Sequence, residues 1–318
     1  MLYYYKIRFD YIKFLGNDRL DLINRLSTND INNLKKLEGI KTILTSDKGR
    51  FVDIITLYNF GDFIFSTCTK NNAASVINHL GKYTIMDDFK TENVSGTHES
   101  ILFFGDSSEN FVSDMFDIDI SNFTNNDFSI YVEENRHSIV SKNDDMFGGF
   151  VFTYALKDKE YFETRLLNSE NKINYKMSEA DESMYETMRI EYGIPKMGKE
   201  MSELTNPLEC HLNKYVSFTK GCYIGQEVIA RLDSYDKISK HLVGIKSTDK
   251  FDIGSQNQLK LTVDNKECGF ATSIATSEKF GNIGLGFVKT IFLSYEKDYK
   301  IKQGDNLTDC KIVELPFK

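Results

Sequence analysis

A glycine hairpin near the N-terminal end of the chain indicates the class of fold. Two strand-like runs, 42–44 and 51–57, are joined by D-K-G (47–49), and the glycine supplies the positive φ that so tight a turn requires. The run 63–67 adds another strand, which we expect to pair antiparallel. Strands joined in this way need helices to cover one face, so the pattern predicts an α+β layer.

Three helices are expected from capping residues and apolar spacing. The first begins at Asp18 and stops at the polar run 27–30, the second begins at Asn71 or Asn72, and the third begins near Asp181. Residues at helical spacing are Leu22, Ile23 and Leu26 in the first helix, Val76, Ile77 and Leu80 in the second, and Met184, Tyr185 and Met188 in the third.

The C-terminal part of the chain has a different pattern. From about residue 240 onward, short strands alternate with Gly, Asp and Asn turns, which predicts an all-β module, most simply a small barrel. A length of 318 residues suits two domains, which we place at 1–238 and 239–318. Residues 105–149 are rich in Asp, Asn and Ser, so there we expect an exposed, variable surface with short strands at 129–132 and 138–140.

Charge and hydropathy exclude several classes of function. The chain has 39 basic and 47 acidic residues, so it lacks the basic surface that non-specific binding to nucleic acid or membranes needs. No stretch approaches the ~20 apolar residues of a membrane span, and no secretory signal is apparent. We therefore expect a soluble cytoplasmic protein, or a mitochondrial-matrix protein if the source is eukaryotic. We expect a monomer, because no exposed apolar stripe or heptad repeat appears.

The cysteines indicate free thiols in a reducing compartment. There are five of them, with no C-x-x-C pair and no zinc-like spacing, so we predict no metal site. Lys220 lies close to Cys222, and a neighbouring cation favours the nucleophilic thiolate. By spacing alone, however, a buried and inert cysteine is the commoner case.

A resemblance to a known family changes that balance. The segment K-G-C-Y-I-G-Q-E (220–227) resembles the signature of the YgfZ-like proteins, a branch of the folate-binding aminomethyltransferase (glycine-cleavage T-protein) family. The resemblance touches most of the chain, although thinly between about 90 and 180. The other segments similar to family motifs are L-S-T-N-D (26–30), D-K-G-R-F-V-D (47–53), R-I-E-Y-G-I-P (189–195), P-L-E (207–209), C-G-F-A-T-S (268–273) and N-I-G-L-G-F-V (282–288).

Membership implies a fold and a ligand. The fold is a cloverleaf of antiparallel α+β modules with a C-terminal small β-barrel, and its central opening holds tetrahydrofolate. Glu203 is our choice for the carboxylate that faces the pterin, because a carboxylate can accept from the adjacent N–H donors of that ring. Glu191 is the alternative, and either residue could instead be a solvated or structural charge. The other residues that the resemblance implies for cofactor binding are Asp53, Gly225, Gln226, Glu227 and Arg231.

The chain departs from the family's enzymes in three places. Where their hairpin ends G-G-x-x-D-D, Asp53 matches the first acid but Ile54 replaces the second, and an isoleucine can neither accept a proton nor stabilise an iminium cation. The segment M-F-G-G-F (146–150) lacks the acid of its Y-T-G-E-x-G-like counterpart. Cys222 stands where the enzymes commonly have aspartate.

These departures fit the YgfZ-like branch, whose members assist the assembly or repair of iron–sulfur clusters in client enzymes and are linked to tRNA modification. In this interpretation Cys222, activated by Lys220, accepts a sulfur species, engages a cluster transiently or forms a mixed disulfide. Expected partners are a reduced folate and client iron–sulfur enzymes or cluster carriers, whereas Cys210 and His211 are structural. The alternatives are a folate-dependent aminomethyl or methyl transferase, and an interaction module that has lost folate affinity.

Overall fold

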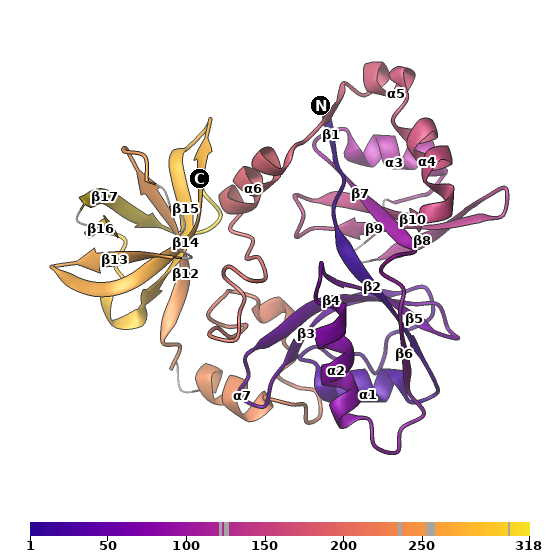
Figure 1. Ribbon diagram of the computed structural model, residues 1–318, viewed down its shortest axis with the longest axis horizontal. Coiled ribbons are helices and arrows are strands. Elements are labelled where there is room, and N and C mark those ends of the chain that lie inside the picture. The colour runs from indigo at the N-terminus through magenta and orange to yellow at the C-terminus, as the bar shows by residue number, and fades with distance from the viewer. Residues whose placement is uncertain (121–122, 124–126, 235–236, 252, 254–257, 305) are drawn as a thin grey trace. The chain divides into compact units, whose positions relative to one another are not determined.

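The computed structural model describes residues 1–318 except 121–122, 124–126, 235–236, 252, 254–257 and 305 (Figure 1). The chain divides into two compact units and passes between them five times, after Thr45, Phe51, Asp181, Lys214 and Ile224. Unit 1 comprises Met1–Thr45, Val52–Asp181 and Tyr215–Ile224, and unit 2 comprises Ser46–Phe51, Glu182–Lys214 and Gly225–Lys318.

The first layer of unit 1 is a five-stranded sheet in the order β3-β4-β5-β2-β6, covered by two helices. The predicted hairpin and the first two predicted helices are confirmed, and Leu22, Leu26 and Val76 lie in the core between helices and sheet. Elements of this layer are β2 (Phe9–Leu15), α1 (Arg19–Leu26), β3 (Gly39–Thr45), β4 (Phe51–Asn59), β5 (Ile64–Thr69), α2 (Ala73–Tyr83) and β6 (Lys90–Asn93).

The side chains of the residues that precede α1 and α2 bind segments outside these helices. Asp18 occupies the N-cap position of α1, but its carboxylate accepts a hydrogen bond from the backbone N–H of Asp88 at 2.7 Å. Asn72 precedes α2 and donates its amide to Asp53 at 2.8 Å. The caps were therefore correctly placed in the sequence, while their side chains connect the helices to other segments.

The second layer of unit 1 is a six-stranded sheet in the order β11-β1-β7-β10-β9-β8. Strand β1 pairs parallel with β11. All other neighbouring strands of this sheet pair antiparallel. Elements of this layer are β1 (Leu2–Tyr5), β7 (His98–Phe104), α3 (Ser108–Phe116), β8 (Phe128–Glu133), β9 (Arg136–Asn143), β10 (Gly149–Ala155), η1 (Leu156–Asp158), α4 (Lys159–Leu166), α5 (Ser169–Asn174) and β11 (Met177–Glu179).

The expectation of an exposed surface over 105–149 is wrong for much of this stretch. The strands predicted at 129–132 and 138–140 are present, but Val140 is fully buried, as are Phe111 and Val112 on α3. Asp, Asn and Ser dominate this segment, but its few apolar side chains form part of the core that covers the six-stranded sheet. Residues 121–122 and 124–126 of this stretch lie outside the described part of the chain.

The two sheets of unit 1 are joined by aromatic packing. Tyr11, Tyr58 and Phe65 from the five-stranded sheet form one cluster with Phe128 and Ile139 from the six-stranded sheet. The buried hydroxyl of Tyr11 also makes a 2.8 Å hydrogen bond with Ser100 on β7. Single-ring aromatics thus provide both apolar area and a polar link, as buried tyrosines usually do.

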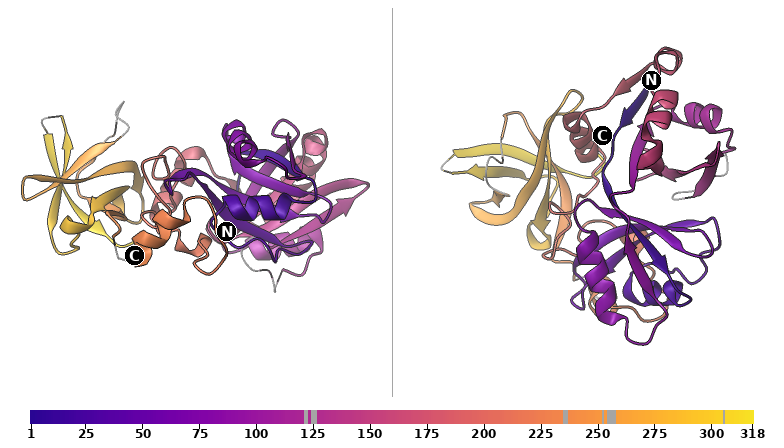
Figure 2. Two further views of the ribbon diagram at one scale, coloured as in Figure 1. Left: turned by 90° about the horizontal axis from the view of Figure 1, so that it is seen from below. Right: turned by 45° about the vertical axis from the view of Figure 1, so that its right-hand side comes forward.

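Unit 2 contains a closed barrel in the order β12-β15-β14-β13-β16-β17 (Figures 1 and 2), which confirms the predicted C-terminal module. Gly269 shows why the barrel motif needs glycine, because a Cβ there would lie 1.9 Å from the carbonyl oxygen of Phe287. Elements of unit 2 are α6 (Glu182–Glu191), η2 (Asn213–Tyr215, ending in unit 1), α7 (Gln226–Ser234), β12 (Lys240–Ser247), β13 (Leu259–Val263), β14 (Lys266–Ser277), β15 (Gly281–Lys289), η3 (Thr290–Phe292), β16 (Asp298–Gln303) and β17 (Asn306–Val313).

A buried ion pair joins α6 to the barrel. The five N–H groups of Arg189 make five hydrogen bonds, among them one to Glu200 at 3.1 Å and one to Ser273 on β14 at 2.8 Å. Glu200 is fully buried and also accepts from the hydroxyls of Thr272 and Ser273, each at 2.6 Å. Such a pair is tolerated in a core because every polar group in it has partners.

None of the helices in the described part of the chain has both the length and the apolarity that crossing a lipid bilayer requires.

The ion pair gives the first testable prediction. Glu200→Gln removes the charge opposite a buried guanidinium, so the free energy of unfolding, measured by urea denaturation, should fall by about 3–5 kcal/mol. Glu182→Gln removes an exposed carboxylate from the outer end of the same network, at Lys196, and should cost less than about 1 kcal/mol. Equal effects of the two variants would contradict the central role of Glu200.

Candidate functional site

Residues 217–224, which include most of the octapeptide K-G-C-Y-I-G-Q-E (220–227), complete the C-terminal end of α1. The last carbonyls of a helix have no partner within it and need other donors. Here the N–H of Ile224 donates to the carbonyl of Arg25 at 3.0 Å, and the N–H of Ser217 donates to that of Thr28 at 2.9 Å. Thr45 on β3 donates its hydroxyl to the carbonyl of Ile224 at 2.7 Å. Residues 217–224 are therefore held firmly against the L-S-T-N-D segment.

Lys220 is the central contact of this arrangement. Its ammonium donates to the carbonyls of Asn24, Ser27 and Asn29 at 2.7, 3.0 and 2.6 Å, which uses all three of its N–H groups. Burial lowers the pKa of Lys220 to about 8, and the carboxylate of Asp30 acts in the opposite direction. The hydrogen bonds of Lys220 are therefore all made to backbone carbonyls at and after the end of α1.

Cys222 differs from the other cysteines in its exposure. It is exposed to solvent, whereas the remaining four are buried. Burial raises the pKa of the thiols of Cys268 and Cys310 to about 11 and about 12, so these two are poor nucleophiles. The expectation that a lone cysteine is buried is therefore wrong for Cys222.

Gly225 allows the second half of the octapeptide to pack against the hairpin turn of unit 2. Its φ is +84°, and a Cβ at this position would lie 2.5 Å from the carbonyl oxygen of Ser46. Helix α7 begins at the next residue, and its Ile229 is buried close to Gly49 of the turn. The predicted ligand residues Gln226, Glu227 and Arg231 lie on this helix, where Gln226 is half-buried and the other two are exposed.

Asp53 has protein partners on both of its oxygens. This fully buried carboxylate accepts from the hydroxyl and the N–H of Thr69, at 2.6 and 3.2 Å, and from the amide of Asn72 at 2.8 Å. It also accepts from the N–H of Ile54 at 2.8 Å. These bonds join β4, the end of β5 and the start of α2, which is a structural role.

Glu191 also has a protein partner. Its carboxylate accepts from the hydroxyl of Ser277 on β14 at 2.5 Å, and its carbonyl accepts from the N–H of Phe317 at 2.8 Å. The sequence left open whether Glu191 binds a pterin or is a structural charge, and its contact with Ser277 favours the structural role.

Glu203 is different, because its carboxylate is exposed and has no hydrogen-bond or ion-pair partner among the described residues. The turn that carries it is nevertheless well fixed. The N–H of Ser202 donates to the hydroxyl of Thr205 at 2.9 Å, and that hydroxyl donates to the carbonyl of Glu200 at 2.9 Å. A fixed turn with an unpartnered carboxylate is suited to binding a ligand with N–H donors.

The predicted site residues are thus divided between the units. Asp53, Lys220 and Cys222 belong to unit 1, whereas Glu191, Glu203, Gly225, Gln226, Glu227 and Arg231 belong to unit 2. Arg50 was not predicted as a site residue, and its guanidinium contacts the carbonyl of Leu204 at 3.1 Å and the buried carboxylate of Glu209 at 3.4 Å. Both Arg50 and Glu209 lie in segments that resemble family motifs, but nothing in their spacing indicated that they pair.

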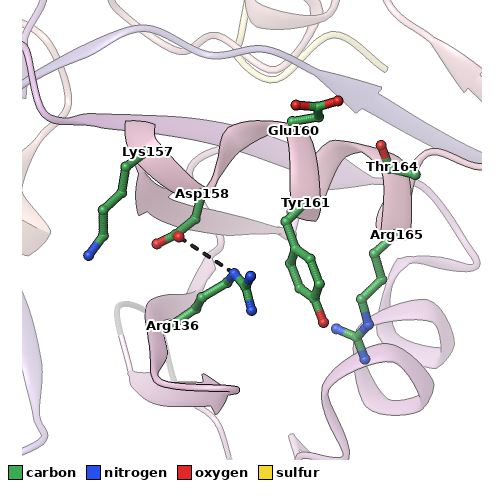
Figure 3. A pocket seen from close by; sticks show the side chains of 7 residues that line it. All are labelled: Arg136, Lys157, Asp158, Glu160, Tyr161, Thr164 and Arg165. Carbon is green, nitrogen blue, oxygen red and sulfur yellow. Dashed lines mark ion pairs between the residues drawn. The ribbon is translucent and has the colours of Figure 1, made fainter.

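A separate pocket of about 550 Å³ lies in unit 1 between α4 and the β8–β9 hairpin (Figure 3). Its guanidinium groups already have internal partners, since Arg136 stacks 3.9 Å over the ring of Tyr161 and pairs with Asp158 at 3.5 Å. Arg165 pairs with Glu133 at 3.2 Å. The lining contains none of the predicted site residues, and it consists of Arg136, Lys157, Asp158, Glu160, Tyr161, Thr164 and Arg165.

Known proteins resemble this chain in sequence and in fold. A candidate transferase of the Arabidopsis thaliana chloroplast is 29% identical over 294 residues, which cover 88% of this chain and 63% of that protein. This chain therefore spans less than two thirds of that relative's length. An aminomethyltransferase of Listeria welshimeri is 25% identical over 309 residues, which cover 95% of this chain and 82% of the enzyme. No protein-family model matches.

Among solved structures, the glycine cleavage system aminomethyltransferase T from Bartonella henselae has the same fold. The TM-score is 0.85 with 14% sequence identity, over 100% of this chain and 86% of that one. The predicted α+β fold with its terminal barrel is thereby confirmed.

The contacts of Lys220 lead to a prediction about stability. Lys220→Met leaves three carbonyls without their donor, so the free energy of unfolding should fall by about 2–4 kcal/mol in urea denaturation. Cys222→Ala changes an exposed side chain two residues away and should stay within about 0.5 kcal/mol of the parent. An unchanged stability of Lys220→Met would show that the carbonyls find other donors.

Gly225 permits a matched comparison of two glycines with similar backbone angles. Gly225→Ala combines a left-handed φ with overlap against Ser46, so it should cost about 3 kcal/mol or more. Gly198→Ala has a φ of +79° but no neighbour within 4 Å of the new Cβ, so it should cost about 1 kcal/mol. Similar melting temperatures for the two variants would mean that the turn moves aside at Gly225.

Proposed function

Since this chain is a relative of the aminomethyltransferases in fold and in sequence, we propose that it binds a reduced folate and assists iron–sulfur cluster assembly or repair. The observation that carries the proposal is the exposure of Cys222 on a segment fixed by Lys220, together with isoleucine at position 54. A fixed and accessible thiol suits exchange with a sulfur- or cluster-carrying partner. Ile54 removes an acid on which the group-transfer chemistry of the enzymes depends.

Folate binding is proposed from the carboxylates of the candidate site. Glu203 is the one that would accept from the N–H donors of a pterin, because it is exposed and unpartnered in the described part of the chain. Asp53 and Glu191 are already engaged by Thr69 and Ser277, respectively. When bound, tetrahydrofolate supplies an acceptor for one-carbon units.

The expected partners are enzymes or carriers that contain iron–sulfur clusters. A cluster held only transiently fits this chain, because no group of three or more potential metal ligands is present among the described residues. We place the protein in a reducing compartment, as an exposed thiol needs in order to remain reactive.

A one-carbon transferase is the second candidate function. It is favoured by the similarity to aminomethyltransferases over 95% of the chain. Tetrahydrofolate-dependent turnover of an aminomethyl donor by the purified protein would establish this function in place of the accessory role, and we expect none.

Ligand binding is tested first. Tetrahydrofolate at a hundred times its dissociation constant should stabilise the native state by ~2.7 kcal/mol and raise the melting temperature. Glu203→Gln should weaken binding at least tenfold, because it removes the charged acceptor. Glu278→Gln, a change at another exposed glutamate, should bind normally. No shift with millimolar tetrahydrofolate would contradict folate binding.

The thiol is tested in cells that lack this protein. Cys222→Ala should accumulate normally but fail to restore the activity of a client iron–sulfur enzyme, whereas Thr219→Ala, an exposed neighbour in the same segment, should restore it. Full restoration by Cys222→Ala would remove the thiol from the mechanism.

A further inference from the structure

Two histidine rings from separate segments of unit 2 lie close together. His211 comes shortly after the P-L-E segment, His241 is the second residue of β12, and their ring centroids are 6.1 Å apart. The N–H of Leu242 donates to the carbonyl of Glu209 at 3.0 Å, which holds the two segments side by side. The proximity of the rings therefore follows from a backbone contact next to each of them.

The turn that carries His211 is fixed without the help of its imidazole. The N–H of His211 donates to the carbonyl of Leu208 at 3.2 Å, and the N–H of Leu212 donates to that of Pro207 at 2.9 Å. Leu208 and Leu212 are buried, whereas His211 is exposed. The φ of His211 is +58°, a conformation that glycine adopts at no steric cost. The turn itself thus gives no reason for an imidazole at this position.

Both imidazoles are available to a ligand. In the described part of the chain, neither ring has a hydrogen-bond or ion-pair partner, and His241 is half-buried beside the exposed His211. Lys240 precedes His241 on β12, so its side chain leaves the strand on the opposite face. There its ammonium lies 5.4 and 5.3 Å from the ring centroids of Phe270 and Phe287. The positive charge of Lys240 is accordingly directed away from the two rings.

The distance between the rings suits a shared metal ion. A neutral imidazole binds transition-metal ions through one ring nitrogen. With metal–nitrogen bonds of about 2.0–2.1 Å, the centroids of two rings on one ion are ~5 Å apart in a tetrahedral arrangement and at most ~6.4 Å apart when the rings lie opposite each other. The observed 6.1 Å lies within this limit, and a change of rotamer at the exposed His211 can shorten it.

The nearby carboxylate of Glu209 is not a third ligand. It accepts from the N–H of Asn206 at 3.2 Å and from the hydroxyl of Ser239 at 2.7 Å, and it pairs with Arg50. Any ion between the rings therefore has two protein ligands and takes the others from water.

We propose that His211 and His241 form a binding site for a divalent transition-metal ion of the zinc class, an inference that is independent of the folate and thiol chemistry proposed above. With two protein ligands and an exposed side, the site exchanges its ion readily, unlike the closed four-ligand sites in which zinc is structural. The pair has no signature in the sequence, because its members come from segments that meet only in the folded barrel unit.

The test is a calorimetric titration of the full chain with Zn²⁺ in the absence of folate. The parent should bind the ion, and His211→Asn and His241→Gln should each weaken binding at least tenfold. Asparagine tolerates the left-handed φ of position 211, and neither ring bonds to the protein, so both variants should melt like the parent without metal. His137→Gln, a change at an exposed histidine of unit 1, should bind like the parent.

Co²⁺ distinguishes this site from the exposed thiol. A thiolate ligand gives Co²⁺ an intense sulfur-to-metal charge-transfer absorption that imidazoles do not, so the parent loaded with Co²⁺ should lack this band. Binding that is lost in Cys222→Ala but kept in both site variants would place the ion at the thiol and overturn the inference, as would a parent that binds no Zn²⁺. Weakened binding in both site variants, with unchanged binding in Cys222→Ala and His137→Gln, supports a site made by the two imidazoles.

Discussion

The ammonium of Lys220 holds in place the segment that carries Cys222, which among the described cysteines is the exposed one. It donates to three carbonyls at and just after the end of α1, a position at which a positive charge also complements the helix dipole. The neighbouring N–H of Ile224 takes one more carbonyl of the same helix. In the sequence Cys222 lies between these two residues, so the segment on either side of it is held by contacts with the backbone of α1. Such an attachment suits the role toward partners that is proposed for Cys222 better than a free loop would.

The segments that resemble family motifs meet one another in pairs. L-S-T-N-D contacts the octapeptide through Lys220, Arg189 of R-I-E-Y-G-I-P contacts Ser273 of C-G-F-A-T-S, and Arg50 of the hairpin contacts Glu209 of P-L-E. These contacts between segments that are far apart in the sequence therefore hold the fold together. Cys222 and Glu203 lie in or close to such segments but are exposed, and they are accordingly the residues for which a role toward ligands or partners is proposed.

Local patterns predicted the hairpin, the helices and the barrel, because turn glycines and the spacing of apolar residues can be read from the sequence alone. The burial of Phe111 and Val140 was missed, since a few apolar residues are diluted there by many polar ones. The partners of Lys220 could not be predicted, because they are backbone carbonyls, which every residue has whatever its side chain. The same holds for Arg50 and the carbonyl of Leu204. Candidate residues could thus be named from the sequence, but whether each one is free or engaged depends on long-range contacts.

The division of the chain also bears on how the protein is made. Unit 1 is completed by Tyr215–Ile224, and Lys220 lies 196 residues after Asn24, whose carbonyl it contacts. At ~5–20 residues per second, a ribosome needs roughly 10–40 s to cover that interval. During this time the end of α1 lacks its proper donors, and the nascent N-terminal layer has to remain soluble without them. The late segment that contains Cys222 therefore also completes the first layer to be synthesised, so a chain that ends before residue 215 has neither a complete unit 1 nor this thiol.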